Sequence, residues 1–154
     1  MTKRGIELGT AGEHLVCADL LCRGHRAFMS AAGLPYDVVA DIGGKLVRIA
    51  VKSTSKPKER PGRAGSKFRY RFMLFRAARH SSGEYSRQLY TRAECDVIAM
   101  VALDTKRVAY MSVDASPQIM WIEADTEQAE YRSGKSLKTI RGFDEFKLED
   151  VAAW

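Results

Sequence analysis

The sequence has few cysteines, and those present follow no recognisable pattern. Cys17, Cys22 and Cys95 are an odd number and lack the paired spacing of zinc sites. Free thiols in a reducing compartment are the simplest interpretation, which argues against a secreted protein held together by disulfides. The three histidines show no ligand spacing to one another either.

Long apolar runs are also missing. The first residues, Met-Thr-Lys-Arg-Gly, contain no signal-peptide core, and no stretch of about 18 apolar residues indicates a membrane span. We therefore expect a soluble, cytoplasmic protein. There is no internal repeat and no linker, and 154 residues with 45% hydrophobic content predict a single domain over residues 1–154 with a proper core.

Positive charge is plentiful and unevenly distributed. The net charge is +6 and the pI is near 9.3, but between residues 52 and 71 the basic residues are opposed by Glu59 alone. A basic segment of this kind is suited to the phosphates of a nucleic acid, whose binding is driven by counterion release. A solvated surface loop is the alternative. The basic residues are Lys52, Lys56, Lys58, Arg60, Arg63, Lys67, Arg69 and Arg71.

The segment 35–52 predicts a β-hairpin, because Gly43-Gly44 tolerates the positive φ of a two-residue turn. That turn fixes a register in which Val39 faces Arg48 and Asp37 faces Ala50. Alternation gives one apolar face for a core and a second, exposed face that carries Asp37, Ala50 and Lys52. An acid and a lysine should therefore lie close together on a rigid sheet.

Periodicity predicts the remaining elements more coarsely. A helix is expected over residues 10–23, ending near Gly24, and a short strand over 25–31. Further strands are expected over 68–76, 96–103, 107–113 and 118–122, the third pairing with the second. In the strand at 68–76, Phe68, Tyr70, Phe72 and Leu74 share one face, and Arg69 and Arg71 the other.

Glu13 has two interpretations. It lies three residues after Thr10, so the two residues could form a capping box at a helix start. It also enters the apolar stripe of Val16, Cys17 and Leu20, which would point its carboxyl group toward the sheet.

Taken together, the motif Pro35-Tyr36-Asp37, the hairpin and Ala50-Val51-Lys52 resemble the signature of the PD-(D/E)XK nuclease superfamily, and Gly9-Thr10-Ala11-Gly12-Glu13 resembles its helix glutamate. The pattern is most similar to small intron-encoded homing endonucleases and Holliday junction resolvases. The resemblance covers residues 5–54 well and the later strands loosely. It implies catalytic roles for Glu13, Asp37, Lys52 and position 50.

The resemblance also implies a divalent metal, Mg²⁺ or Mn²⁺, bound by Asp37, by Glu13 directly or through water, and by the Val51 carbonyl. Hard oxygen ligands of this type suit Mg²⁺, which polarises a phosphoryl oxygen and activates water. Lys52 would orient that water or stabilise charge on the phosphate. In this pattern Ala50 stands where an acid or glutamine is usual, and alanine supplies no ligand.

Three accounts of Ala50 are open: an engineered inactive nuclease, a natural enzyme in which another acid serves the site, or a natural protein that binds DNA without cutting it. The retention of Glu13, Asp37 and Lys52 favours the first.

The sequence thus predicts an α/β protein with a restriction-endonuclease-like core, in which a central mixed β-sheet is flanked by helices. The expected function is metal-dependent DNA endonuclease, homing-endonuclease-like, with a Holliday junction resolvase or a non-catalytic DNA-binding pseudo-nuclease as alternatives. The expected substrate is double-stranded or branched DNA. Cleavage of two strands by one small site per chain implies a homo-oligomer, a dimer or tetramer. The expected DNA contacts come from Lys56, Lys58, Arg60, Arg63, Lys67, Arg69 and Arg71.

Overall fold

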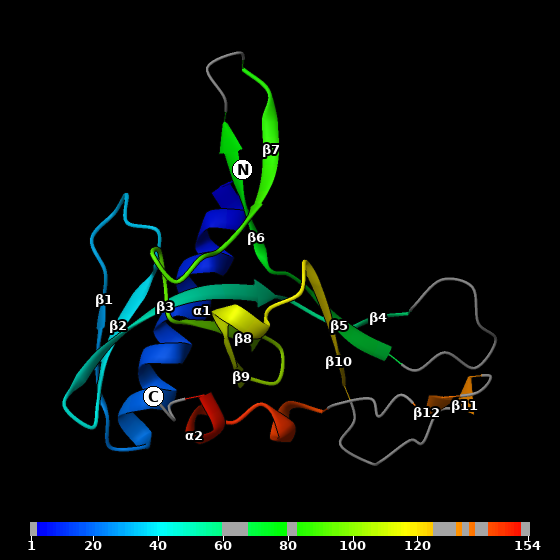
Figure 1. Cartoon of the computed structure of the whole chain (residues 1–154). Helices are drawn as coiled ribbons and strands as arrows, with labels where there is room; N and C mark the ends of the chain where they lie inside the picture. Colours follow the sequence, from blue (N-terminus) through cyan, green and yellow to red (C-terminus); the bar gives the residue numbers. More distant parts are fainter. Residues whose placement is uncertain are drawn as a thin grey trace.

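A five-stranded mixed sheet forms the centre of the molecule (Figure 1). The computed structural model describes residues 3–59, 68–79, 83–124, 132–133, 136–137 and 142–151. The sheet has the strand order β1-β2-β3-β8-β9, in which only β3 and β8 are parallel neighbours. Its strands are β1 Arg26–Met29, β2 Val38–Ile42, β3 Lys45–Thr54, β8 Val97–Ala102 and β9 Arg107–Ser112.

The predicted hairpin is confirmed, and so is its register between the turn and the pair of Val38 with Ile49; Asp37, predicted to face Ala50, lies outside the paired residues and donates its N–H to Ile49. Ile42 pairs with Lys45 and Val39 with Arg48, as the two-residue turn requires. Gly43 and Gly44 have φ values of 60° and 82°, in the left-handed region that favours glycine. The turn chemistry therefore fixes which residues of β2 and β3 lie opposite each other.

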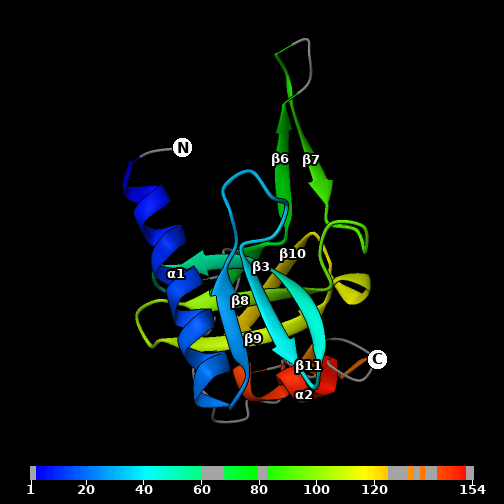
Figure 2. The same cartoon turned by 90° about the vertical axis from the view of Figure 1, so that its left-hand side faces the viewer.

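Helix α1, Lys3–Cys22, covers one face of the sheet (Figure 2). It begins seven residues before the predicted start at Thr10, so Thr10 and Glu13 lie inside the helix and the capping-box interpretation is wrong. Gly5 and Gly9 disfavour helix, but extending a helix already held by packing is far easier than nucleating one. The buried residues of α1 are Gly12, Val16 and Leu20.

The second face of the sheet is covered as well. The prediction that this face is exposed is therefore wrong at Ala50, which lies between Asp37 and Lys52. Ala50 is 0% exposed and packs in a cluster with Tyr70 and Phe72. These two aromatic residues belong to β5, in a smaller sheet of order β10-β5-β4. Burial on both sides also explains the unbroken apolar run of β8, all of which is buried. The bounds are β4 Lys58–Glu59, β5 Phe68–Met73 and β10 Ile119–Glu123.

The strand predicted over 68–76 is in fact two strands. Strand β5 ends at Met73, Leu74 is fully buried, and a separate hairpin of β6 and β7 begins at Phe75. The predicted aromatic face is confirmed for Tyr70 and Phe72, whereas Phe68 is 53% exposed. The remaining elements are β6 Phe75–Arg79, β7 Tyr85–Leu89, η1 Val113–Ala115, β11 Arg132–Ser133, β12 Ser136–Leu137, η2 Phe143–Glu145 and α2 Leu148–Val151.

Three segments rise on the same side of the central sheet: the N-terminal end of α1, the connection from β1 to β2, and the β6–β7 hairpin (Figure 2). Asp37 lies at the end of the β1–β2 connection, directly before β2. Within the part of the chain that the structure describes, no helix has the length and apolar character needed to cross a membrane.

Candidate active site

Asp37 is fixed by three hydrogen bonds. Its backbone N–H donates to the Ile49 carbonyl at 2.9 Å, and its own carbonyl accepts the Ser30 N–H at 2.9 Å. Its side-chain Oδ2 accepts the Val51 N–H at 2.7 Å. The carboxylate is therefore held against the edge of β3 at the position where β2 begins.

The same geometry orients the Val51 carbonyl. In a strand, the N–H and C=O of one residue point to the same edge, as the exchange of both bonds in antiparallel pairs requires. The Val51 N–H points to Asp37, so the Val51 carbonyl oxygen also points to the β2 side of β3. At Val51 this side lies beyond the first residue of β2, Val38, which pairs with Ile49. Two oxygen ligands predicted from the sequence thus lie side by side.

Gly12 brings α1 onto β3 next to this edge. A Cβ at this position would lie 1.8 Å from Ser53 Oγ and 3.6 Å from a Val51 methyl carbon, so only glycine allows the observed approach. The next residue of α1, Glu13, is half-buried. The close contact at Gly12 therefore positions Glu13 beside the end of β3.

The charge of Asp37 affects the pKa of Glu13. Burial raises the pKa of the Glu13 carboxyl above its usual 4.5, and the negative charge of Asp37 raises it further. Two carboxyl groups that repel each other next to a backbone carbonyl are a donor set that fits Mg²⁺, which commonly uses one or two carboxylates together with water and substrate phosphate. No group of three or more His, Cys, Asp or Glu side chains arranged to hold a metal occurs among the described residues.

Lys52 completes the set predicted from the sequence. It follows Val51 on β3 and is half-buried. Burial lowers the pKa of its ammonium group, while the charge of Asp37 acts in the opposite direction. A desolvated cation one residue beyond the Asp37 contact can stabilise negative charge on a phosphate more strongly than a solvated lysine can.

Tyr90 was missed by sequence reasoning. The Lys52 ammonium nitrogen lies 4.9 Å from the centroid of the Tyr90 ring, a cation–π contact. Burial raises the pKa of the Tyr90 hydroxyl, with the charge of Asp37 as the next cause. Tyr90 comes directly after β7, and neither residue spacing nor composition connects it to Lys52 before the fold is known.

Ala50 lies beneath this site in a filled apolar environment. Its side chain packs in the cluster that includes buried Cys95 and, partly buried, Tyr36 and Tyr90. Burial raises the pKa of the Cys95 thiol to about 12. The structure therefore brings Glu13, Asp37, Val51 and Lys52 together but provides no oxygen ligand at position 50.

The predicted DNA-binding residues have different environments. Lys56 and Lys58 are exposed, whereas Arg60, Arg63 and Lys67 lie outside the described residues. Arg71 is exposed, with its guanidinium 5.8 Å from the Trp121 ring centroid. Arg69 instead forms an ion pair with Glu123 at 3.5 Å, and only 13% of its side chain is exposed. Arg69 is thus largely a structural residue.

Comparison with known proteins decides the family. The sequence profile described as PD-(D/E)XK endonuclease matches residues 5–147, nearly the whole chain. The chain belongs to the PD-(D/E)XK endonuclease family. No curated protein is significantly similar to it in sequence.

Among solved structures, this chain is similar to a bacterial homing endonuclease, I-Ssp6803I. The two share 18% sequence identity over 81% of this chain and 82% of the other, with a TM-score of 0.58. At this identity the likeness establishes the fold, and it confirms the expected restriction-endonuclease-like core with a central mixed sheet. The smaller sheet that contains β5 adds a second layer to this core in the PD-(D/E)XK protein.

Proposed function

We propose that this chain is a cytoplasmic, metal-dependent DNA endonuclease of the homing-endonuclease type, formed by one nuclease domain over residues 1–154. The observation that carries the proposal is the Asp37 carboxylate bound to the Val51 N–H, with Lys52 next along β3 and the Glu13 carboxyl within electrostatic range. These groups are the ones for which the resemblance implies catalytic roles. Mg²⁺ or Mn²⁺ would be held by Asp37, Glu13 and the Val51 carbonyl.

The bound metal would supply Lewis-acid polarisation of a phosphoryl oxygen and a water of lowered pKa. The residues of the chain provide the rest. Asp37, fixed by its three hydrogen bonds, defines where the scissile phosphate lies relative to β3. Lys52, fixed by Tyr90, places positive charge beside the phosphate as negative charge develops on it.

Position 50 sets the expected activity. Without an oxygen ligand there, metal binding and hydrolysis should be weaker by orders of magnitude than in a complete site. The described residues offer no third acid that replaces this ligand, so a natural enzyme with a relocated acid is the account least supported by the structure. The inactivated nuclease and the DNA-binding pseudo-nuclease are distinguished by restoring the ligand.

The test is the substitution Ala50→Gln, with Ala50→Met as a control of similar size that has no oxygen. Ala50→Gln should raise Mg²⁺- or Mn²⁺-dependent cleavage of supercoiled plasmid well above background, and Ala50→Met should not. Adding Asp37→Ala to the glutamine variant should abolish cleavage. Because Ala50 is fully buried, either longer side chain should cost about 1–3 kcal/mol of stability, so folding is checked by thermal unfolding.

If the restored variant stays folded and cuts neither linear, supercoiled nor four-way-junction DNA, the enzyme proposal fails and the DNA-binding pseudo-nuclease replaces it. Preferential cleavage of the junction would identify a resolvase instead. We further propose that the active form is a homo-oligomer, at least a dimer, because a double-strand cut needs two such sites.

Contacts to DNA are proposed for the basic segment, with Lys56 and Lys58 on phosphates and exposed Arg71 on bases. Arg60, Arg63 and Lys67 belong to the same segment of the sequence. If Arg71 reads a base pair, Arg71→Ala should cost about 1–3 kcal/mol for one duplex sequence and much less for a scrambled duplex, as measured by equilibrium binding.

A further inference from the structure

The β6–β7 hairpin projects from the body of the molecule (Figures 1 and 2). Within the described residues its two strands pair only with each other, from Phe75 with Leu89 to Arg79 with Tyr85. An isolated two-stranded ribbon is at best marginally stable in water, so this one adds little to the core. Its role is therefore to be sought in contact with a partner.

The base of the hairpin is built into the candidate active site. Buried Leu74 precedes β6, and Tyr90, which directly follows β7, contacts the Lys52 ammonium group. On the same side, Arg76 of β6 forms an ion pair with Glu94 of the body. The ribbon thus leaves the body next to the lysine proposed to meet the scissile phosphate. DNA bound at Lys52 would run past the hairpin.

The charge of the hairpin suits this partner. Between residues 75 and 89 the sequence holds Arg79 and Arg87 against Glu84, besides Arg76, whose charge is balanced by its ion pair with Glu94. A positive ribbon projecting beside a phosphodiester site is complementary to the backbone of duplex DNA. A two-stranded β-ribbon also has the width to enter the major groove.

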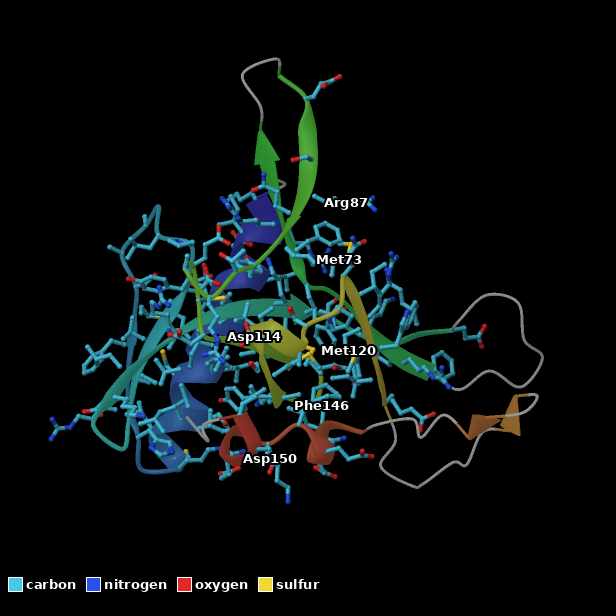
Figure 3. The ribbon with its side chains drawn as sticks, viewed as in Figure 1. Met73, Arg87, Asp114, Met120, Phe146 and Asp150 are labelled. Atoms are coloured by element: carbon cyan, nitrogen blue, oxygen red, sulfur yellow. The ribbon has the colours of Figure 1, made fainter. Side chains whose placement is uncertain are left out.

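Arg87 has the best placement for reading bases. It is exposed on β7, and in the view of Figure 3 it extends to the same side of the hairpin as Met73. Its guanidinium lies 5.2 Å from the Phe75 ring centroid, a contact that orients the group and leaves its charge and hydrogen-bond donors available. Gln88 is also exposed, but strand alternation places it on the opposite face of the ribbon, with Arg76.

We propose that the β6–β7 hairpin enters the major groove of duplex DNA beside the cleavage site and that Arg87 reads a guanine there. The inference rests on the proposed function, because it takes duplex DNA as the substrate, and it adds a sequence-reading element outside the basic segment 52–71. Arginine bound to the two acceptors of guanine is the commonest specific contact in the major groove.

The experiment is selection from a pool of random-sequence DNA duplexes in EDTA, so that binding is measured without cleavage. The unmodified chain should enrich a motif with a defined guanine. Arg87→Ala should remove the preference at that position and weaken binding to the enriched duplex by about 5- to 150-fold. Its affinity for a scrambled duplex should change only as much as that of Arg26→Ala, which removes one exposed arginine from β1.

Gln88→Ala is the matched control on the other face of the same strand and should leave the motif unchanged. The proposal is overturned if the chain enriches no motif, if Arg87→Ala keeps it, or if Gln88→Ala alone alters it. Failure of the nuclease proposal is distinguishable, because that is decided by cleavage with the Ala50→Gln variant, which retains Arg87. Unchanged thermal unfolding of the Arg87 variant confirms that its fold is intact.

Discussion

The backbone N–H of Val51 donates a 2.7 Å hydrogen bond to the Asp37 carboxylate. One peptide group thereby connects an acid at the start of β2 to the strand that carries Lys52. The carboxylate accepts the hydrogen bond that a backbone carbonyl would accept if β2 extended further toward the N-terminus. The site therefore begins where regular strand pairing ends. Its charge then influences Glu13, Lys52 and Tyr90.

The pKa of Glu13, raised by burial and by Asp37, predicts a pH-dependent stability. The folded state holds the Glu13 proton more tightly than the unfolded chain, so stability is lost as the pH rises from the usual value of 4.5 through the folded value. Glu13→Gln should therefore raise the unfolding temperature at pH 7 and leave it unchanged at pH 3. Equal effects at both pH values would contradict this.

The same variant separates structure from metal binding. We expect Mg²⁺ or Mn²⁺ to raise the unfolding temperature of the unmodified chain and to have a smaller effect on Glu13→Gln, although that variant is the more stable one without metal. A metal-induced shift of equal size in both proteins would remove Glu13 from the proposed ligand set.

The contact between Lys52 and Tyr90 predicts a change in the pKa of the lysine. A cation–π contact favours the charged form, so Tyr90→Leu should lower the Lys52 pKa further, while Tyr90→Phe keeps the ring and most of the effect. The pKa can be followed by NMR of ¹³C-methylated lysines, with Lys52→Arg used for assignment. A Lys52 pKa that is unchanged or higher in Tyr90→Leu would refute the contact.

Arg69 and Arg71 should differ sharply in their contribution to stability. Removing Arg69 leaves Glu123 buried without its partner, so Arg69→Ala should lower the free energy of unfolding by about 3–5 kcal/mol. Arg71→Ala should lower it by less than about 1 kcal/mol. Urea unfolding measures both. The double variant Arg69→Met/Glu123→Leu should recover much of that stability, and similar decreases in the two single variants would be inconsistent with this assignment.

Gly12 predicts an effect of a single methyl group on α1. Gly9→Ala, which meets nothing within 4 Å, should stabilise the protein by about 1 kcal/mol through helix propensity. Gly12→Ala gains the same propensity but meets Ser53, so we expect a net destabilisation and a weaker metal-induced rise in unfolding temperature, because Glu13 is displaced. Both are measured by thermal unfolding. Stabilisation by Gly12→Ala would show that the approach of α1 is not tight.

The exposed lysines of the basic segment predict a salt effect. Lys56→Ala/Lys58→Ala should lower the salt slope of duplex binding by up to about 0.9 for each phosphate that the variant no longer neutralises. The control pair Lys106→Ala/Lys147→Ala, also exposed, removes the same charge outside the segment. If both pairs change the slope equally, the segment has no special role in binding.

Local pattern was enough to predict the hairpin and its register from the turn to Val38, because two glycines and strand alternation determine both within 18 residues. It failed where distant segments decide the outcome. Tyr70 and Phe72 bury Ala50, and the Tyr90 ring contacts Lys52. All three aromatic residues are distant from residues 35–52 in sequence, so the hairpin pattern could not predict these contacts. Likewise, Arg69 and Arg71 are equivalent in a strand pattern and differ only because Glu123 lies opposite one of them.

The parallel pairing of β3 with β8 has a consequence for the order of folding. A two-residue turn connects β2 to β3. Pairing of β3 with β8, in contrast, requires closure of a loop that contains residues 55–96. Non-local closure is the slower event, since the entropy of the loop is lost before the pairing forms. The hydrogen bond between Asp37 and Val51 should therefore form early, before β8 pairs with the other edge of β3. Protection of the β8 amides from hydrogen exchange should develop later than that of the β2 amides.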